Sequence, residues 1–221
     1  MLKRLLTMKP IGFQHLQYED MACIEKNLSS CYVQQYENDN GNSCFKYLNR
    51  LWKYILKDLR LNDIDITKII NEYKPEMFWL KHAKLNILQM KACAEKVGRE
   101  DIAVALQQWM KAEVYLSKAN VSSISEEHIQ YLAARLAIRP GKWRDWQIFA
   151  DYSGCSGEEI NQIHSLARDE MKVLVYMYDQ HGDVDINYIT SVARKYNVIG
   201  PRLAELDQTI GKIECNIINR I

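Results

Sequence analysis

The amino-acid sequence predicts an all-α fold. Apolar residues recur every three or four positions in many segments, whereas β-branched clusters are short and do not alternate, so long strands are hard to place. Only four prolines and nine glycines interrupt the 221 residues. With 48% apolar and 26% charged residues, the composition is that of a globular protein with one domain or two.

Charge and cysteine content narrow the classes of function. The net charge of +1 provides no general attraction to nucleic acid, so no nucleic-acid partner is expected. The six cysteines form no CxxC pair and no close Cys-His pairing, which argues against zinc and favours free thiols. No apolar run is long enough for a signal peptide or a membrane span. We therefore expect a cytoplasmic protein without direct membrane insertion.

Helices are expected throughout the first half of the chain. Residues 18–28 are a candidate helix, Glu37–Ser43 is polar and turn-prone and should be a loop, and Cys44–Leu61 carries the apolar stripe of one helix. Pro75 suits the first turn of a further helix, and Gly98 suits the left-handed cap that ends the next. This half should be a helical bundle.

The second half contains clearer signals for the ends of helices. Residues 117–125 break the apolar pattern and are the expected interdomain linker. Ser123–Glu126 and Ser156–Glu159 each fit a capping box, which predicts that helices begin there. The next 95 residues or so contain six apolar stripes, which predict six helices. One residue from each stripe, in sequence order, is Leu132, Trp146, Ile160, Leu174, Ile189 and Leu206.

No cluster of residues indicates catalysis. The five histidines are scattered and have no ordered Cys or Asp partner, and Gly98 and Gly182 stand alone, so they form no phosphate-binding loop. We therefore expect a non-enzyme with no cofactor.

Residues 126–214 resemble the death domain. The order of features carries the likeness: a Trp with an apolar pair in Asp145–Ala150, a polar helix in Ser156–Ile163, an aromatic helix end in Val173–Tyr178, and paired apolar residues in Ile186–Ala193. No single motif among these is specific, and the ordered set carries the resemblance.

The first half resembles the related death effector domain. Gly98–Ile102, with Arg99 and Asp101, is similar to that family's Arg-x-Asp-Leu signature, with Ile in place of Leu. Glu76–Leu85 and Trp52–Ile55 are similar to other segments of the family. The Gly98–Ile102 match is the most specific short one in the chain.

The two resemblances together imply a tandem of two six-helix antiparallel bundles of the death-fold type. The expected effector-like domain spans residues 13–116 and the expected death domain spans 126–218. This layout implies an adaptor that bridges an upstream death-domain receptor or adaptor to an initiator caspase with tandem death effector domains. It also implies higher-order homotypic assembly, in apoptosis or in innate immune signalling.

The resemblance implies partner-binding residues on the effector-like domain. They are Tyr54, Arg99, Asp101 and Ile102, although helical spacing also allows Tyr54 to lie in the core, and Arg99 and Asp101 to serve only local structure. An acidic partner of Arg99 is expected among Glu19, Asp20 and Glu37.

In the death domain, Trp146, Phe149, Leu174 and Ile189 are expected in the core. The charged residues near helix ends are instead the candidates for partner contacts: Arg144, Asp145, Glu158, Glu159, Asp183, Asp185, Arg194 and Arg202.

Two alternatives stay open at this point. The chain could be a death-domain adaptor with an unrelated N-terminal helical module. It could also be a helical ligand-binding protein or enzyme whose resemblance is a coincidence, in which case a deep pocket lined by His, Cys or carboxylate groups is expected.

Overall fold

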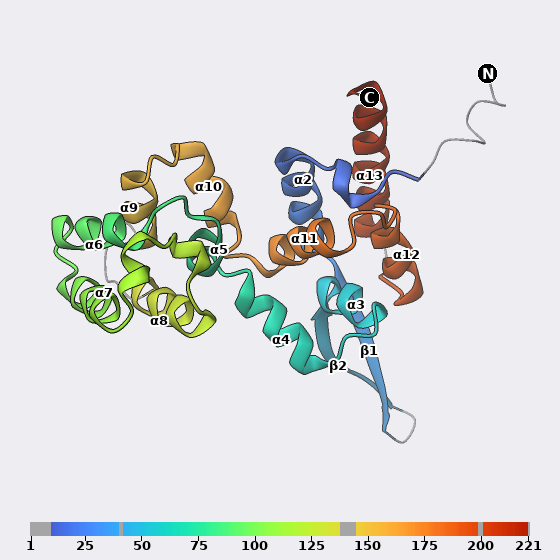
Figure 1. Cartoon of the computed structure of the whole chain (residues 1–221). Coiled ribbons are helices and arrows are strands. Elements are labelled where there is room, and N and C mark those ends of the chain that lie inside the picture. Colours follow the sequence, from blue (N-terminus) through green and yellow to red (C-terminus); the bar gives the residue numbers. More distant parts are fainter. Residues whose placement is uncertain (1–9, 40–41, 138–144, 199–200, 221) are drawn as a thin grey trace. The chain divides into compact units, whose positions relative to one another are not determined.

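The computed structural model describes residues 10–39, 42–137, 145–198 and 201–220 (Figure 1). The chain is mostly helical, as its sequence predicts, with one added β-hairpin. It divides into two compact units: unit 1 comprises residues 1–71 and 168–221, and unit 2 comprises residues 72–167. Among the helices described, none is sufficiently long and apolar to cross a membrane.

Unit 1 combines helices from both ends of the chain with the hairpin. Its elements are η1 (Phe13–His15), α2 (Tyr18–Leu28), β1 (Tyr32–Asp39), β2 (Asn42–Arg50), α3 (Leu51–Asp58), α4 (Asp63–Glu72), α11 (Asp169–Gln180), α12 (Tyr188–Lys195) and α13 (Pro201–Arg220). Unit 2 is continuous and helical, with α5 (Pro75–His82), α6 (Ile87–Lys96), α7 (Glu100–Ala112), η2 (Val114–Lys118), η3 (Val121–Ser123), α8 (Glu126–Leu136), α9 (Asp145–Tyr152) and α10 (Gly157–Ser165).

This division differs from the expected tandem of residues 13–116 and 126–218, because each expected domain contributes to both units. The expected linker at residues 117–125 lies inside unit 2. Its Val121 is fully buried, and the Val121 N–H donates to the Leu85 carbonyl at 2.8 Å. The Ile87 N–H donates to the Ala119 carbonyl at 3.0 Å. Polar composition indicated a linker, but alternate apolar residues hold this segment in the core.

The helix expected over Cys44–Leu61 begins only at Leu51. The residues before it form β2, which pairs antiparallel with β1 in a hairpin. The expected loop Glu37–Ser43 therefore consists of strand ends, apart from residues 40–41, which lie outside the described part. Each strand bonds the backbone groups of the other that face it, and the apolar spacing of one segment does not show which segment it pairs with. The Asn-Gly pair at 40–41 was the available hairpin signal.

Several helix ends follow the predicted chemistry. Pro75 occupies the first turn of α5, and Gly98 ends α6 with a left-handed φ of 75°. The Ser156 capping box begins α10, as expected. The cap of α8 is Ser125, not Ser123: the Ser125 side chain accepts from the third backbone N–H of the helix, while the Ser123 hydroxyl donates to a preceding carbonyl.

The core of unit 1 joins segments that lie far apart in the sequence. Helix α2 packs against both α11 and α13, and α3 packs against α11 and α12. Phe13, Ile24 and Ile55 from the first segment are fully buried with Leu174 and Leu206 from the second. Unit 1 therefore needs both segments to complete its core.

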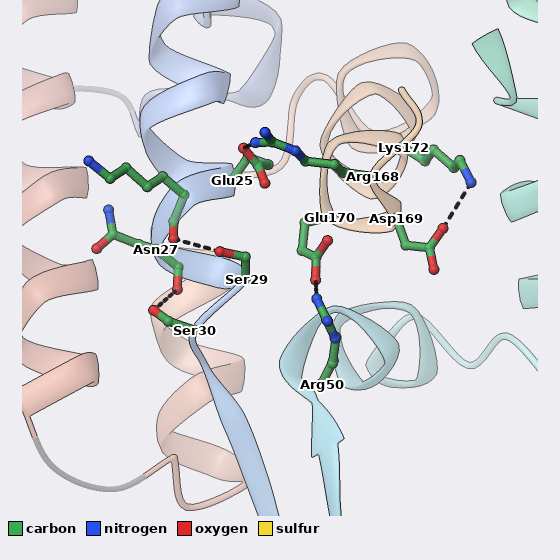
Figure 2. A network of polar contacts seen from close by, with 10 residues as sticks. Glu25, Asn27, Ser29, Ser30, Arg50, Arg168, Asp169, Glu170 and Lys172 are labelled. Atoms are coloured by element: carbon green, nitrogen blue, oxygen red, sulfur yellow. Dashed lines mark hydrogen bonds and ion pairs between the residues drawn. The ribbon is translucent and has the colours of Figure 1, made fainter. Parts of the chain in front are cut away.

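Buried carboxylates reinforce this junction (Figure 2). Arg168 donates to Glu25 of α2 at 2.8 Å, and Arg50 at the end of β2 donates to Glu170 of α11 at 2.5 Å. The side chains of Glu25 and Glu170 are only 5% and 4% exposed, whereas their arginines reach solvent. A carboxylate removed from water needs such a partner, so these pairs couple the two segments.

Unit 2 has its own core. Trp79 of α5 and Phe149 of α9 meet in an edge-to-face contact with ring centroids 6.4 Å apart, and both are almost fully buried. Trp146 is also buried, as expected. Because these contacts all lie within residues 72–167, the core of unit 2 requires no residue of unit 1.

We predict that Arg168→Ala destabilises the protein by about 1–3 kcal/mol, because it leaves the buried Glu25 carboxylate without its partner. Urea denaturation measures the change. Arg202→Ala is the matched control: Arg202 and Glu205, 3.6 Å apart, are each more than half exposed. Its loss should cost less than about 0.5 kcal/mol. Equal effects of the two changes would contradict the structural role of Arg168.

We also predict that a fragment of residues 72–167 folds alone, with a helical circular-dichroism spectrum and cooperative thermal unfolding. Fragments 13–116 and 126–218 should not unfold cooperatively, because each lacks part of two cores. Cooperative folding of these two fragments but not of 72–167 would overturn the division into unit 1 and unit 2.

Candidate partner-binding surface

A charged cluster lies where the start of α7 meets the end of α8. The Arg99 guanidinium donates to both carboxylate oxygens of Asp101 at 2.8 Å, and also to the Arg135 backbone carbonyl at 3.1 Å. The Arg135 guanidinium is 3.9 Å from the Asp101 carboxylate. Arg99 itself is only 11% exposed at its side chain, so the cluster is a fixed part of the surface.

The turn after α6 puts Arg99 in this position. Gly98 adopts the left-handed conformation, and the Arg99 N–H then donates to the Ala94 carbonyl at 2.8 Å, which closes a Schellman motif. Helix α7 starts at the next residue, so Arg99 is its N-terminal cap residue.

An aromatic cluster occupies the other end of the same two helices. The Trp109 ring of α7 lies 4.0 Å from the His128 ring and 5.5 Å from the Tyr131 ring, both on α8. The Arg135 guanidinium lies 5.2 Å from the Tyr131 ring centroid. Since the start of α7 meets the end of α8 and the reverse, the two helices run antiparallel along this face.

We call this face the α7–α8 surface, made of Arg99, Asp101, Trp109, His128, Tyr131 and Arg135. The side chains of Asp101 and Arg135 are 37% and 46% exposed, and Tyr131 is 37% exposed. Arginine, tyrosine and tryptophan are the residues most enriched at the centres of protein interfaces. Mutual contacts restrain them before any partner binds, which reduces the entropy lost on association.

The structure separates the expected effector-domain residues. Arg99 and Asp101 lie together in unit 2, as the signature predicts, but Ile102 is fully buried and belongs to the core. Tyr54 lies in unit 1 and is 8% exposed, with its ring 4.7 Å from that of Tyr196. Core burial was the alternative left open for Tyr54, and neither it nor Ile102 can offer a contact surface without exposure.

Among the described side chains, Asp101 of the same signature is an acidic partner of Arg99, and it was not among the three residues expected for this role. Among the three candidates, Glu19 and Asp20 lie in α2 of unit 1, where Asp20 pairs with Arg220 at 2.6 Å. The side chain of Glu37 lies outside the described part.

The expected death-domain contacts are also divided. Glu158 and Glu159 are exposed on α10 of unit 2, and Glu159 caps that helix. Backbone hydrogen bonding from Ser156 lowers the pKa of Glu159. Arg144 lies outside the described residues, and only the backbone of Asp145, at the start of α9, is described.

The other four death-domain candidates lie in unit 1. Asp183 is exposed, and Asp185 accepts from the Asn187 backbone N–H at 2.9 Å just before α12. Arg194 bonds both carboxylate oxygens of Asp207 at 2.8 Å, and Arg202 pairs with Glu205. The candidates whose side chains are described are therefore divided between the two units.

Sequence reasoning missed the aromatic half of the α7–α8 surface. The apolar spacing of Ile102, Leu106 and Trp109 indicates a buried face of α7, and Tyr131 and Arg135 lie between the apolar positions of α8. A tyrosine and an arginine one helical turn apart, beside an apolar stripe, was the available signal.

A cavity of about 270 Å³ in unit 2 is lined by residues that include Trp79, His82, Cys155 and Glu159. The His82 Nδ1 lies 2.8 Å from the Phe78 carbonyl, which can only accept, so Nδ1 is the donor of this hydrogen bond. The Cys155 Sγ lies 3.4 Å from the Ser153 hydroxyl. Within the described ranges, no three His, Cys, Asp or Glu side chains gather to hold a metal ion.

We predict that Asp101→Asn lowers the free energy of unfolding by about 0.5–1 kcal/mol at pH 7. The hydrogen bonds from Arg99 hold the pKa of Asp101 below its usual value. A lowered folded-state pKa stabilises above the unfolded value of about 3.9 and loses its effect as the pH falls through the folded value. The difference from wild type should therefore shrink between pH 5 and about pH 2–3.

Urea denaturation at several pH values measures this change, and Asp151→Asn, at an exposed position of α9, is the control. A penalty for Asp101→Asn that persists unchanged in acid would contradict the assigned ion pair.

No protein-family model, no curated protein and no solved structure matches the chain.

Proposed function

We propose that the protein is an adaptor that bridges an upstream death-domain receptor or adaptor to an initiator caspase with tandem death effector domains. The sequence features of its two halves resemble those of the Fas-associated death-domain adaptor in a divergent, invertebrate form, which fits apoptotic or innate immune signalling. Such an adaptor acts by concentrating caspase chains through higher-order homotypic assembly, so its effect is avidity.

The α7–α8 surface is the observation that carries this proposal. It includes the Arg99–Asp101 pair of the effector-domain signature, held at the surface beside Arg135 and three aromatic rings. Charged groups there select a complementary partner, and Tyr131 and Trp109 supply the contact area. We assign the caspase-binding role to this face of unit 2.

Two compact units provide the two sides that a bridge requires. Unit 1 carries exposed charges, and we assign the upstream contact to Asp183, Arg194 and Arg202. The death fold enters this proposal only through unit 2. Its described residues form six α-helices, α5–α10, and this number is that of one death-fold bundle.

The test uses Arg135→Glu in the full-length chain and a tandem effector-domain fragment of an initiator caspase. We predict at least about tenfold weaker binding by fluorescence anisotropy, because an acidic residue beside Asp101 reverses the local charge at a hot-spot position. The free-energy equivalent is about 1.4 kcal/mol or more. The fold should survive, since the Arg135 side chain is 46% exposed.

Lys111→Glu is the matched control, because it makes the same charge change at an exposed position of α7 that is not part of the α7–α8 surface. It should leave binding within about twofold. Equal weakening by both variants would indicate a general charge effect, and undiminished binding by Arg135→Glu would rule out this surface.

A second candidate function is a thiol-dependent enzyme or ligand-binding protein. The unit 2 cavity favours it, because His82, Cys155 and Glu159 share its lining. Cys155→Ser separates the two candidates: it should leave caspase-fragment binding unchanged for an adaptor, whereas a thiol-dependent activity would disappear. Rapid, selective alkylation of Cys155 over the exposed Cys23 and Cys215 would support the second candidate.

A further inference from the structure

The hairpin of unit 1 has an open edge at β1. Among the described residues, β1 pairs with β2 alone, in a two-stranded sheet. The loop end of this hairpin extends away from the helices of unit 1 (Figure 1). A two-stranded ribbon is marginally stable in water, and further strands or a packed helix stabilise it. The outer edges of such a ribbon offer backbone N–H and C=O groups to another strand.

The two outer edges differ in how well they are protected. The register skips Lys46, because its neighbours Phe45 and Tyr47 pair with consecutive residues of β1. Lys46 is therefore the extra residue of a β-bulge in β2. Bulges, lysines and prolines are the means by which proteins prevent pairing at a sheet edge. β1 has no extra residue in this register, and its sequence contains no lysine or proline. Addition of a strand is therefore expected at β1.

Alternate residues of β1 present their backbone groups to this outer edge. The Leu51 N–H donates to the Cys31 carbonyl at 3.1 Å, next to the first residue pair of the ladder. In an antiparallel ladder, every second residue bonds to a given neighbour. Because Cys31 bonds toward β2, the odd-numbered residues of β1 do so too. The even-numbered ones therefore turn their N–H and C=O groups outward, and they include Tyr32, Gln34 and Tyr36.

These outward residues are symmetric about Gln34. They share one face of the strand, because side chains alternate along it. A second β1, related by a two-fold axis at Gln34, would place Tyr32 of each copy opposite Tyr36 of the other. Aromatic pairs at such opposite positions stabilise an antiparallel ladder, and Tyr32 is accessible, with 38% exposure. Glu37 and Asp39 of the two copies would lie at opposite ends of the new ladder, so these like charges do not meet.

We infer that β1 pairs with β1 of a second copy of this chain, antiparallel and across a two-fold axis at Gln34. The two hairpins form one sheet in the order β2-β1-β1-β2, and each of its outer edges carries the Lys46 bulge. The contact is isologous, so it closes at the dimer. A foreign strand lacks the symmetry of the outward positions, which is why a second copy is the occupant. This contact is separate from the α7–α8 surface and does not depend on the adaptor proposal.

Sedimentation velocity of the full-length chain tests the pairing. We expect a monomer–dimer equilibrium with a Kd of about 10–100 μM, because the contact is smaller than a standard interface. Gln34→Lys puts two ammonium groups opposite each other at the axis, and Gln34→Glu puts two carboxylates there. Each variant alone should therefore dimerise at least about tenfold more weakly than the wild type. An equimolar mixture of the two should dimerise at least as tightly as the wild type, because lysine then faces glutamate.

Gln208→Lys is the matched control, because it makes the same change at an exposed position of α13, outside the hairpin. It should leave the Kd within about twofold. Arg135→Glu should also leave the dimer intact, which separates this contact from the caspase-binding surface. Circular dichroism of each variant checks that the fold is retained. A wild-type chain that is still monomeric at about 200 μM would refute the pairing. Gln34 variants that dimerise normally, or a mixture of them that stays monomeric, would refute it as well.

Discussion

The pairing of buried carboxylates with distant arginines is the constraint on which unit 1 depends. Glu25 and Glu170 lose most of their hydration in the folded chain, and each regains a charged partner only when the first and last segments meet. Apolar burial supplies most of the stabilisation, but it does not specify which helices adjoin. The ion pairs add that specification, because a wrong pairing would leave a carboxylate buried without a cation (Figure 2).

Unit 2 does not depend on such ion pairs between the first and last segments of the chain. The core of unit 2 is built within one continuous segment, and Trp109 of the α7–α8 surface packs against it. On the α7–α8 surface, Arg99 is buried enough to hold Asp101 and α8 in place, while Arg135 and Tyr131 remain exposed. Arg99 therefore stabilises the surface, while the exposed Arg135 and Tyr131 are available for partner contacts.

The candidate site was predictable in part. The signature contains Arg99 and Asp101 two positions apart at one helix start, where they pair, although the acidic partner of Arg99 was expected elsewhere in the sequence. Trp109 and Tyr131 could not be joined to them from the sequence, because α7 and α8 meet only in the tertiary structure. For the same reason, the sequence did not show that the helix of Tyr54 packs in unit 1, whereas Arg99 and Asp101 belong to unit 2.

Local patterns by themselves determined the helical class and many helix ends. Pro75, Gly98 and Ser156 act through their own backbone and their nearest neighbours in sequence, so their effect can be predicted from the local sequence. The hairpin, the burial of residues 117–125 and the division into two units were decided only by tertiary structure. Each depends on which distant segment supplies a hydrogen bond, an apolar contact or a counter-charge, and periodicity along the chain carries no such information.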